Sequence, residues 1–261
     1  MREKSDLIEV ELKFLPKNSD VEVLTLLRSL LQPGWALAKS SPRIVLDIYM
    51  DTDDLYLNRT DAPLRFRKRR KKNGWTANFK LPSKGQYDYL ERREIYTTLE
   101  NEEVLRYKTN DIPGQASLSA YDFIASKGNK SLRFSSQRCM LKPIVLIVSY
   151  RQMYSVRPMG FAHRGLELVH VLFDEMTAFD IRDMDIDHLV THGELDYSTD
   201  TPYHTCGFNL VEIEADCGRN RKADKRNLFE LMVEKIRSNN FTMTQRNKYQ
   251  TSIDSLDITQ S

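Results

Sequence analysis

Strict alternation of apolar and charged residues near the start of the chain constrains its fold more than any other feature. Residues 8–14 read IEVELKF, so a strand here places Glu9, Glu11 and Lys13 on one face and only apolar side chains on the other. For this segment alone, the simplest interpretation is a half-buried strand that turns its charges to water.

The same alternation returns in three later segments, residues 64–69, 75–81 and 211–215. Their charged positions are Arg65, Arg67 and Arg69, then Lys80, then Glu212 and Glu214. If these strands close into a barrel with their charged faces inward, carboxylates and cations form one two-signed interior. The apolar faces then point outward and need covering helices or loops. Such a hydrated tunnel suits a polyanion bound together with a divalent metal, because carboxylates bind the metal while arginine and lysine bind phosphate oxygens.

These segments together resemble the signature of the CYTH superfamily, also called triphosphate tunnel metalloenzymes. Seven elements occur in the expected order between residue 8 and about residue 215. They are Glu9-x-Glu11-x-Lys13, Tyr49-x-Asp51-Thr52, Leu64-Arg65-x-Arg67, Thr76 to Lys80 followed by Pro82, Arg92-x-Glu94, Arg151-x-x-Tyr154 and Glu212-x-Glu214. The resemblance implies an α+β fold, built on a closed eight-stranded antiparallel β-barrel with covering helices.

The resemblance also implies roles for individual residues. The expected metal ligands are Glu9, Glu11, Glu212 and Glu214, a hard oxygen site suited to Mg²⁺ or Mn²⁺. The expected substrate-binding residues are Lys13, Arg65, Arg67, Lys80, Arg92 and Arg151. The expected catalytic residues are Glu9, Glu11, Lys13, Arg65 and Arg67. One position departs from the family, which often has lysine where this chain has Ser149, and this removes one expected phosphate contact.

Three functions are compatible with this pattern. The resemblance implies a metal-dependent hydrolase that cleaves a phosphoanhydride of inorganic triphosphate, thiamine triphosphate or a nucleoside triphosphate. A class IV adenylate cyclase, which makes cyclic AMP from ATP, is the first alternative, although residues 49–55 resemble the hydrolases more closely. The second alternative is a non-catalytic polyphosphate-binding module, which the four glutamates disfavour because anion binding needs only the cations. The absence of a G-x-x-x-x-G-K-[ST] loop excludes the common nucleotide-binding motif.

Length and composition limit the setting in which this chemistry operates. The 261 residues predict one domain, with a surface insertion around residues 101–141 and a disordered tail from about residue 255. A formal net charge of +2 gives no global basic field that would favour a nucleic acid partner, although local basic patches remain. The resemblance implies a small triphosphate as the partner. Cys139, Cys206 and Cys217 lack metal or disulfide spacing, and no apolar run spans a membrane, so we expect a cytoplasmic protein with reduced thiols. Nothing in the sequence indicates an oligomeric state.

The remaining elements follow from periodicity and turn signals. Apolar residues at helical spacing predict helices after Ser19-Asp20 and around residues 228–236, and alternating or apolar runs predict strands over 43–50, 90–99, 143–156 and 166–174. Asn73-Gly74 predicts an antiparallel hairpin between the two segments that flank it. The inward face of the strand over 90–99 is ambiguous in the sequence, and only the resemblance selects Arg92 and Glu94. His188, His192 and His204 match no metal motif and are interpreted as loop residues.

Overall fold

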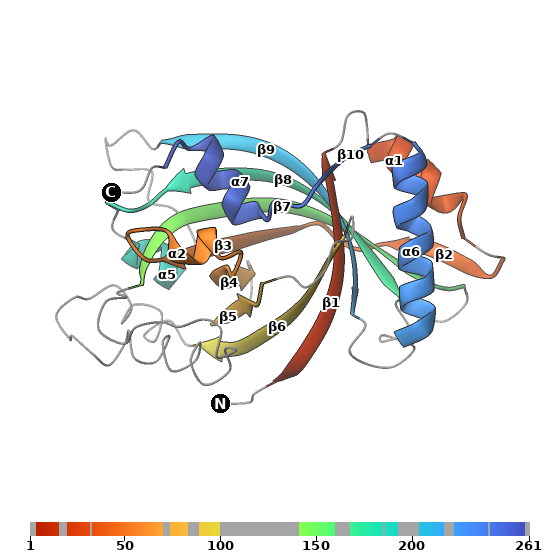
Figure 1. Ribbon diagram of the computed structural model, residues 1–261, viewed down its shortest axis with the longest axis horizontal. Helices are drawn as coiled ribbons and strands as arrows, with labels where there is room; N and C mark the ends of the chain where they lie inside the picture. Colours follow the sequence, from red (N-terminus) through yellow and green to blue (C-terminus); the bar gives the residue numbers. More distant parts are fainter. Residues whose placement is uncertain are drawn as a thin grey trace.

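The computed structural model (Figure 1) describes residues 4–15, 20–31, 33–69, 74–82, 89–99, 141–159, 168–184, 186–192, 204–216, 222–239 and 241–258. Within them the chain forms one ten-stranded sheet in which every pairing is antiparallel. The strands are β1 (Lys4–Leu15), β2 (Trp35–Lys39), β3 (Arg43–Asp51), β4 (Leu64–Arg69), β5 (Trp75–Lys80), β6 (Leu90–Leu99), β7 (Lys142–Pro158), β8 (Val169–Asp180), β9 (Thr205–Asp216) and β10 (Thr242–Thr244). The helices are α1 (Asp20–Arg28), α2 (Tyr56–Arg59), α5 (Asp187–His192), α6 (Lys222–Ser238) and α7 (Lys248–Ser255).

The strand pairings start at β1 and return to it. From β1 the order is β6, β5, β4, β3, β7, β8 and β9, and β9 pairs again with β1. At Glu11, β1 is paired with Leu90 of β6 on one side and with Glu214 of β9 on the other. Two short strands extend this arrangement, since β2 pairs with the end of β7 and β10 with the end of β1.

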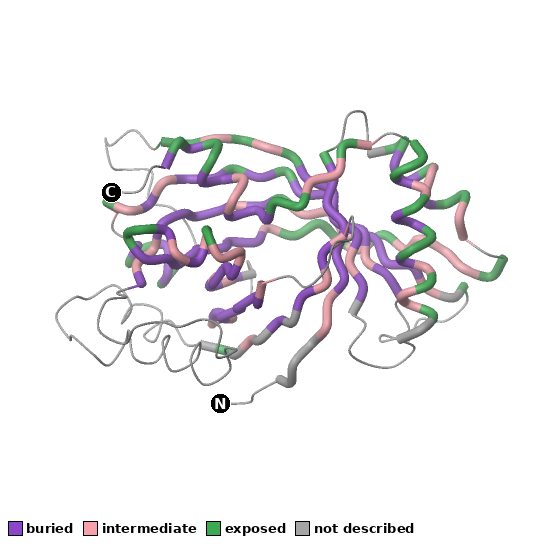
Figure 2. The backbone as a smooth tube through the Cα atoms, in the orientation of Figure 1, coloured by how far each residue is buried: buried purple, intermediate pink, exposed green. Residues whose placement is uncertain are grey.

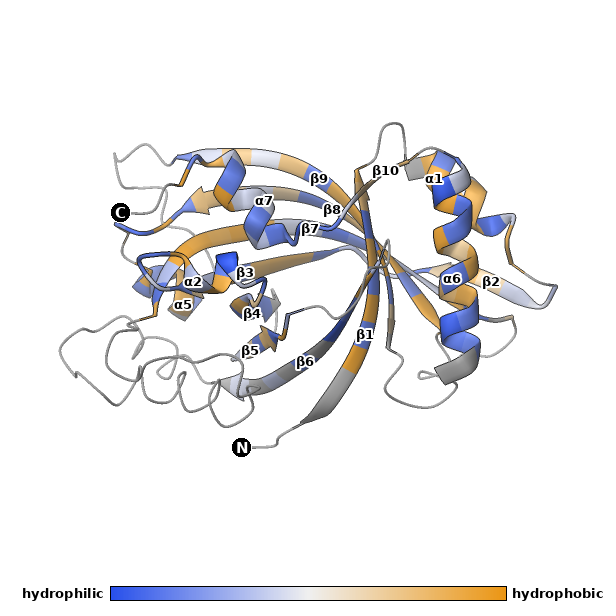
Figure 3. Ribbon diagram, in the orientation of Figure 1, coloured by the Kyte–Doolittle hydropathy of each residue, from blue (hydrophilic) through white to orange (hydrophobic). Residues whose placement is uncertain are grey.

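Alternate residues of β1 separate an apolar face from a charged face. Val10, Leu12 and Phe14 are buried in a cluster that also contains residues of α1 and α6. Glu11 and Lys13 are buried as well, with 1% and 3% of their surface exposed, and lie on the opposite face. We call this opposite side, enclosed by the strands, the interior. Figure 2 shows buried residues along most strands and exposed residues in the first half of β9, and Figure 3 shows apolar and polar residues interspersed along α6.

The helices lie in three places. α1 and α6 sit side by side at one end of the molecule (Figure 1) and share the cluster that buries the outer face of β1 and β9. α5 packs through Leu189 and Val190 on a second cluster, which contains the outer residues of β3, β4 and β5. α7 packs on neither of these clusters. Its Tyr249 and Ile253 belong to a third cluster, together with Tyr49, Val145 and Met176.

The structure confirms the predicted α+β class and the antiparallel strands. The hairpin prediction is confirmed by the pairing of β4 with β5, although its turn at residues 70–73 lies outside the described residues. β6 places Arg92 and Glu94 together in contact with interior residues, which resolves the ambiguity of its faces. The predicted insertion lies outside the described residues except for Leu141, which is buried.

Four sequence predictions need correction. The sheet has ten strands instead of eight, because β7 is 17 residues long and extends beyond β3 to pair with β2, and because β10 adds to β1. His188 and His192 lie on α5, where their rings stack, and not in a loop. The strand predicted over 166–174 begins at Val169 and extends to Asp180. Residues 255–258 of the predicted disordered tail are ordered, since Leu256 and Ile258 are buried in the cluster around α7, while residues 259–261 lie outside the described residues. Among the described residues, no helix is long and apolar enough to cross a membrane.

Candidate functional site

Three carboxylates meet where β1 lies beside β9. Glu11, Glu212 and Glu214 each place an oxygen atom so that all three oxygens lie within 4.8 Å of one another. The register explains the meeting, because Glu11 is opposite Glu214 and Lys13 is opposite Glu212. These are three of the four predicted metal ligands. Glu9 lies next to them on β1, and its Oε2 is 2.9 Å from Nζ of Lys80.

Burial and mutual repulsion perturb these acids. Burial raises the pKa of Glu214, and the nearby charge of Glu212 raises it further. The pKa of Glu9 is raised well above its usual value by burial and by Glu94. Burial alone would raise the pKa of Glu11 too, but Lys13, Lys80 and Arg92 outweigh it and hold that pKa well below the usual value. A group of carboxylate oxygens with this repulsion is suited to a hard divalent cation.

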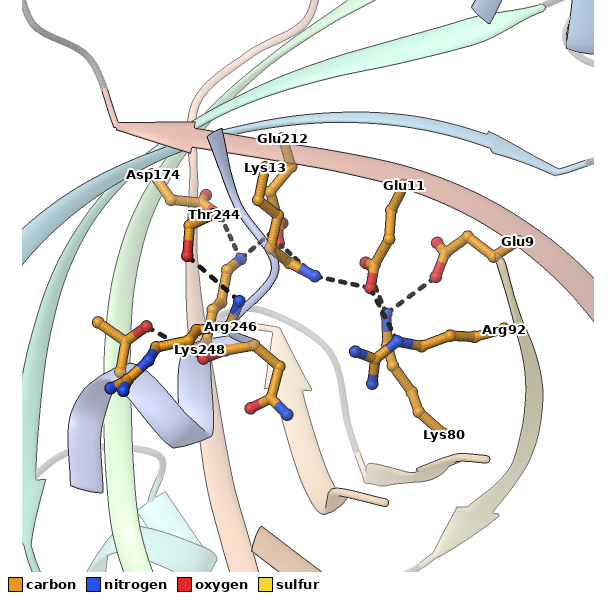
Figure 4. Close-up of polar contacts among 12 residues, drawn as sticks. Glu9, Glu11, Lys13, Lys80, Arg92, Asp174, Glu212, Thr244, Arg246 and Lys248 are labelled. Atoms are coloured by element: carbon orange, nitrogen blue, oxygen red, sulfur yellow. Dashed lines mark hydrogen bonds and ion pairs between the residues drawn. The ribbon is translucent and has the colours of Figure 1, made fainter. Parts of the chain in front are cut away.

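Two lysines lie between these acids (Figure 4). Lys13 Nζ is 2.6 Å from an oxygen of Glu11 and 3.9 Å from an oxygen of Glu212. Lys80 extends from β5, and its Nζ is 2.9 Å from Glu9, 3.0 Å from Glu11 and 2.6 Å from Glu94. Both lysines were predicted to bind substrate, and the fold brings both to the acidic group.

Two of the predicted arginines each form a bidentate ion pair with an aspartate. Arg67 donates from Nε and Nη2 to the two oxygens of Asp47, at 2.6 and 2.7 Å, and Arg65 lies 3.8 Å from the same carboxylate. Arg151 forms the equivalent pair with Asp174, at 2.7 Å for both bonds, and lies 3.5 Å from Glu212. Such bidentate pairs hold the guanidinium planes in a defined orientation.

Arg92 has a different environment from the other predicted substrate-binding cations. Its side chain is 0% exposed. Nε lies 3.4 Å from Glu11, and Nη2 donates to Asp61 at 3.0 Å. Arg92 therefore links the acidic group to the segment that follows α2.

The structure adds three residues that sequence reasoning did not assign to the site. Asp47 interrupts an apolar strand, and Asp174 directly follows the mostly apolar run of residues 169–173. An acid at such a position is a signal that could have identified both. Lys248 is the first residue of α7, and its Nζ is 2.5 Å from Asp174 and 2.8 Å from Glu212. No local pattern marks Lys248, because only the docking of α7 brings it to the interior.

The interior is compact and its cations are paired. A cavity of about 20 Å³ is lined by Lys13, Tyr49, Pro63, Arg65, Asn78, Lys80, Glu212, Asn247 and Lys248. This volume holds one or two water molecules at most. Each of the lysines and arginines named above has a carboxylate oxygen within 4.0 Å. An anionic ligand therefore has to compete with these carboxylates for the cations.

The chain belongs to the CYTH domain family, whose domain matches residues 7–196. Its fold is similar to that of a candidate adenylate cyclase from Bacillus halodurans, with 17% sequence identity, a TM-score of 0.50, and coverage of 95% of this chain and 98% of that one. A protein from Pyrococcus horikoshii is 15% identical, with a TM-score of 0.46 and coverage of 93% and 97%. An adenylyl cyclase candidate from Hippeastrum with a dominant triphosphatase activity is 13% identical, with a TM-score of 0.46 and 93% coverage of each chain. Identities this low show the fold alone. No curated protein matches the sequence significantly.

The matched domain ends before β9 and α7. Glu212, Glu214 and Lys248 lie beyond residue 196. The two glutamates nevertheless meet Glu11, and Lys248 contacts Asp174, and both of these partners lie within the matched residues. The site therefore combines the matched domain with the C-terminal part of the chain.

Proposed function

We propose that this protein is a metal-dependent hydrolase that cleaves a phosphoanhydride bond of a small triphosphate. The observation that carries the proposal is the close approach of Glu11, Glu212 and Glu214, with oxygens within 4.8 Å of one another, beside buried lysines and arginines of the interior. A site that only binds an anion would be weakened by three converging carboxylates, because they repel the ligand. A site for a metal–triphosphate complex needs both signs of charge.

In this proposal, the ring of paired strands acts as a closed barrel whose interior is a tunnel for the triphosphate. Glu11, Glu212 and Glu214 hold Mg²⁺ or Mn²⁺, and Glu9 is a further ligand on the same face of β1. When bound, the ion supplies charge neutralisation at the phosphate oxygens and a means of activating water.

The cations of the tunnel bind and orient the substrate. Lys13, Arg65, Arg67, Lys80 and Arg151 hold phosphate oxygens, and Lys248 joins them from α7. Lys13, Arg65 and Arg67 also act in catalysis, because charge on the leaving phosphate oxygens grows in the transition state and fixed cations stabilise it. No covalent nucleophile is required. Arg92 acts from behind Glu11, where it keeps that carboxylate ionised.

To reach the cations, the substrate has to displace carboxylates that already pair with them. Arg67 is held by Asp47, and Lys80 is held by three glutamates. A divalent ion held by Glu9 and Glu11 would weaken the hold of these carboxylates on Lys13 and Lys80 and leave both lysines more available to phosphate. Metal and triphosphate should therefore favour each other's binding.

The test is product analysis with inorganic triphosphate and with ATP as substrates, each incubated with and without Mg²⁺ or Mn²⁺. Metal-dependent release of inorganic phosphate supports the hydrolase. Cyclic AMP from ATP would identify a cyclase instead, and tight binding of triphosphate without turnover would identify a binding module. Hydrolysis at full rate in excess chelator would contradict the role assigned to the glutamates.

A further inference from the structure

The N-terminus of α7 is attached to the interior by its first residues. Asn247 caps the helix, with its side chain accepting from the backbone N–H of Gln250 at 2.9 Å while the side chain of Gln250 accepts from the backbone N–H of Asn247 at 2.9 Å. Lys248 follows at once and reaches Asp174 and Glu212. The helix has only eight residues, too few to be stable alone, so its position must come from contacts with the rest of the fold.

The first of these contacts is made by Asp51, at the end of β3. Its carboxylate is buried and accepts hydrogen bonds from the backbone N–H groups of Thr52, Leu57 and Asn58, at 2.8, 2.8 and 2.9 Å. A fourth donor is the hydroxyl of Tyr249, at 3.0 Å. The three backbone bonds fix the carboxylate. Its bond to the hydroxyl then fixes Tyr249, the residue that follows Lys248.

The ring of Tyr249 is fixed as well. It stacks on Tyr49, the residue two before Asp51, with centroids 5.0 Å apart and planes 5° from parallel. Tyr249 is 0% exposed. Stacking sets the plane of the ring, and the bond to Asp51 sets its position within that plane.

The second contact is made by Asp61, which follows α2. Its Oδ1 accepts from Nδ2 of Asn247 and from Nη2 of Arg92, both at 3.0 Å. Asp61 has a φ of 53°, a left-handed conformation that costs energy in a residue with a side chain. Because Arg92 also contacts Glu11, Asp61 connects the cap of α7 to the acidic group.

We propose that Asp51 and Asp61 are positioning residues that place the ammonium of Lys248 in the triphosphate site, acting through Tyr249 and Asn247 respectively. The two carboxylates flank α2 and bind the residues immediately before and after Lys248. This inference rests on the proposed function, since it assigns Lys248 to the bound triphosphate. It gives the α2 segment, which carries no phosphate-binding side chain, a defined part in substrate binding.

The test is a double-mutant cycle on binding of inorganic triphosphate, measured by calorimetry without divalent metal. Lys248→Met removes the charge but keeps the length of the side chain, and should weaken binding roughly ten- to a hundredfold. Tyr249→Phe removes only the hydroxyl and should weaken binding roughly two- to tenfold in the wild-type background. In the Lys248→Met background, Tyr249→Phe should have no further effect on binding, because the group that it positions is gone.

A purely structural role gives a different result. If Tyr249 only stabilises the fold, Tyr249→Phe changes the urea midpoint and affects binding equally in both backgrounds, which would overturn the inference. The matched control is Tyr154→Phe, since Tyr154 is also buried but packs against Phe173 on the outer face. We expect it to leave triphosphate binding unchanged in both backgrounds.

Asp61 is tested separately through its partner. Asn247→Ser keeps a good helix cap but loses the amide donor to Asp61, so it should also weaken binding only when Lys248 is present. Additive behaviour of this variant would remove Asp61 from the inference even if the Tyr249 arm succeeds. A wild-type protein that does not bind triphosphate at all would overturn the proposed function, whereas binding with an additive cycle would overturn only the positioning role.

Discussion

Replacing Asp47 with asparagine separates the folding role of the arginines of β4 from their proposed role in phosphate binding. Asp47 is 0% exposed and accepts two bonds from Arg67, with Arg65 3.8 Å away. Asparagine keeps the shape of the side chain and one acceptor oxygen but removes the negative charge. Two cations that are only 13–14% exposed then lose the counter-ion that they share.

The expected loss of stability is large. Removing one partner of a buried ion pair costs about 3–5 kcal/mol, and the retained acceptor places this variant near the lower end, about 3 kcal/mol. For a chain of this size, that corresponds to a decrease in melting temperature of roughly 6–12 °C.

Triphosphate should reverse part of this loss. If Arg65 and Arg67 bind phosphate, Asp47 competes with the substrate for them, so Asp47→Asn should bind metal-free triphosphate about tenfold more tightly. A tenfold gain adds about 1.4 kcal/mol of stabilisation at a saturating concentration. Urea unfolding in chelator, with and without inorganic triphosphate, measures both quantities on the same samples.

The control is Asp180→Asn, because Asp180 forms the same kind of bidentate pair with Arg182 at the end of β8, where both side chains are more exposed. This more exposed pair should contribute about 1 kcal/mol or less. Its removal should leave the effect of triphosphate on stability unchanged. Equal stabilisation of wild type and Asp47→Asn by triphosphate would refute the reasoning, since the arginines would then not contact the ligand.

Three further outcomes follow from the site. Glu212→Gln should greatly reduce metal-dependent phosphate release, while metal-free triphosphate binding holds or improves; equal losses in both assays would contradict the separation of metal ligands from phosphate ligands. Lys80→Ala should weaken metal-free triphosphate binding roughly ten- to a hundredfold by calorimetry. Burial would raise the pKa values of Asp47 and Asp174, but the neighbouring cations outweigh it and hold both pKa values well below the usual range. Because the folded-state pKa values are lowered, these acids stabilise the fold above about pH 4 and lose that contribution as the pH falls further. The free energy of unfolding should therefore decrease as the pH is lowered from about 4, and this decrease should be smaller in Asp47→Asn.

Much of the framework of the site could be predicted from sequence because alternation is a local property. A strand turns every second side chain to the same face, so the spacing of Glu9, Glu11 and Lys13 already places them together. The same reasoning groups Arg65 with Arg67, and Glu212 with Glu214. The Asn73-Gly74 turn also predicts the pairing of β4 with β5, since the conformation of a short hairpin depends on its own residues.

Only the tertiary structure decided which of these faces meet, and how. Glu11 and Glu214 are about 200 residues apart in the chain and become neighbours through the register of β1 against β9, which no local pattern specifies. Lys248 lies on a short helix whose location depends on buried contacts with Asp51, Asp61 and Tyr49. Alternation therefore determined which residues share a face of a strand. Long-range pairing and helix docking determined the acidic group, the ion pair at each cation and the contribution of the C-terminal segment.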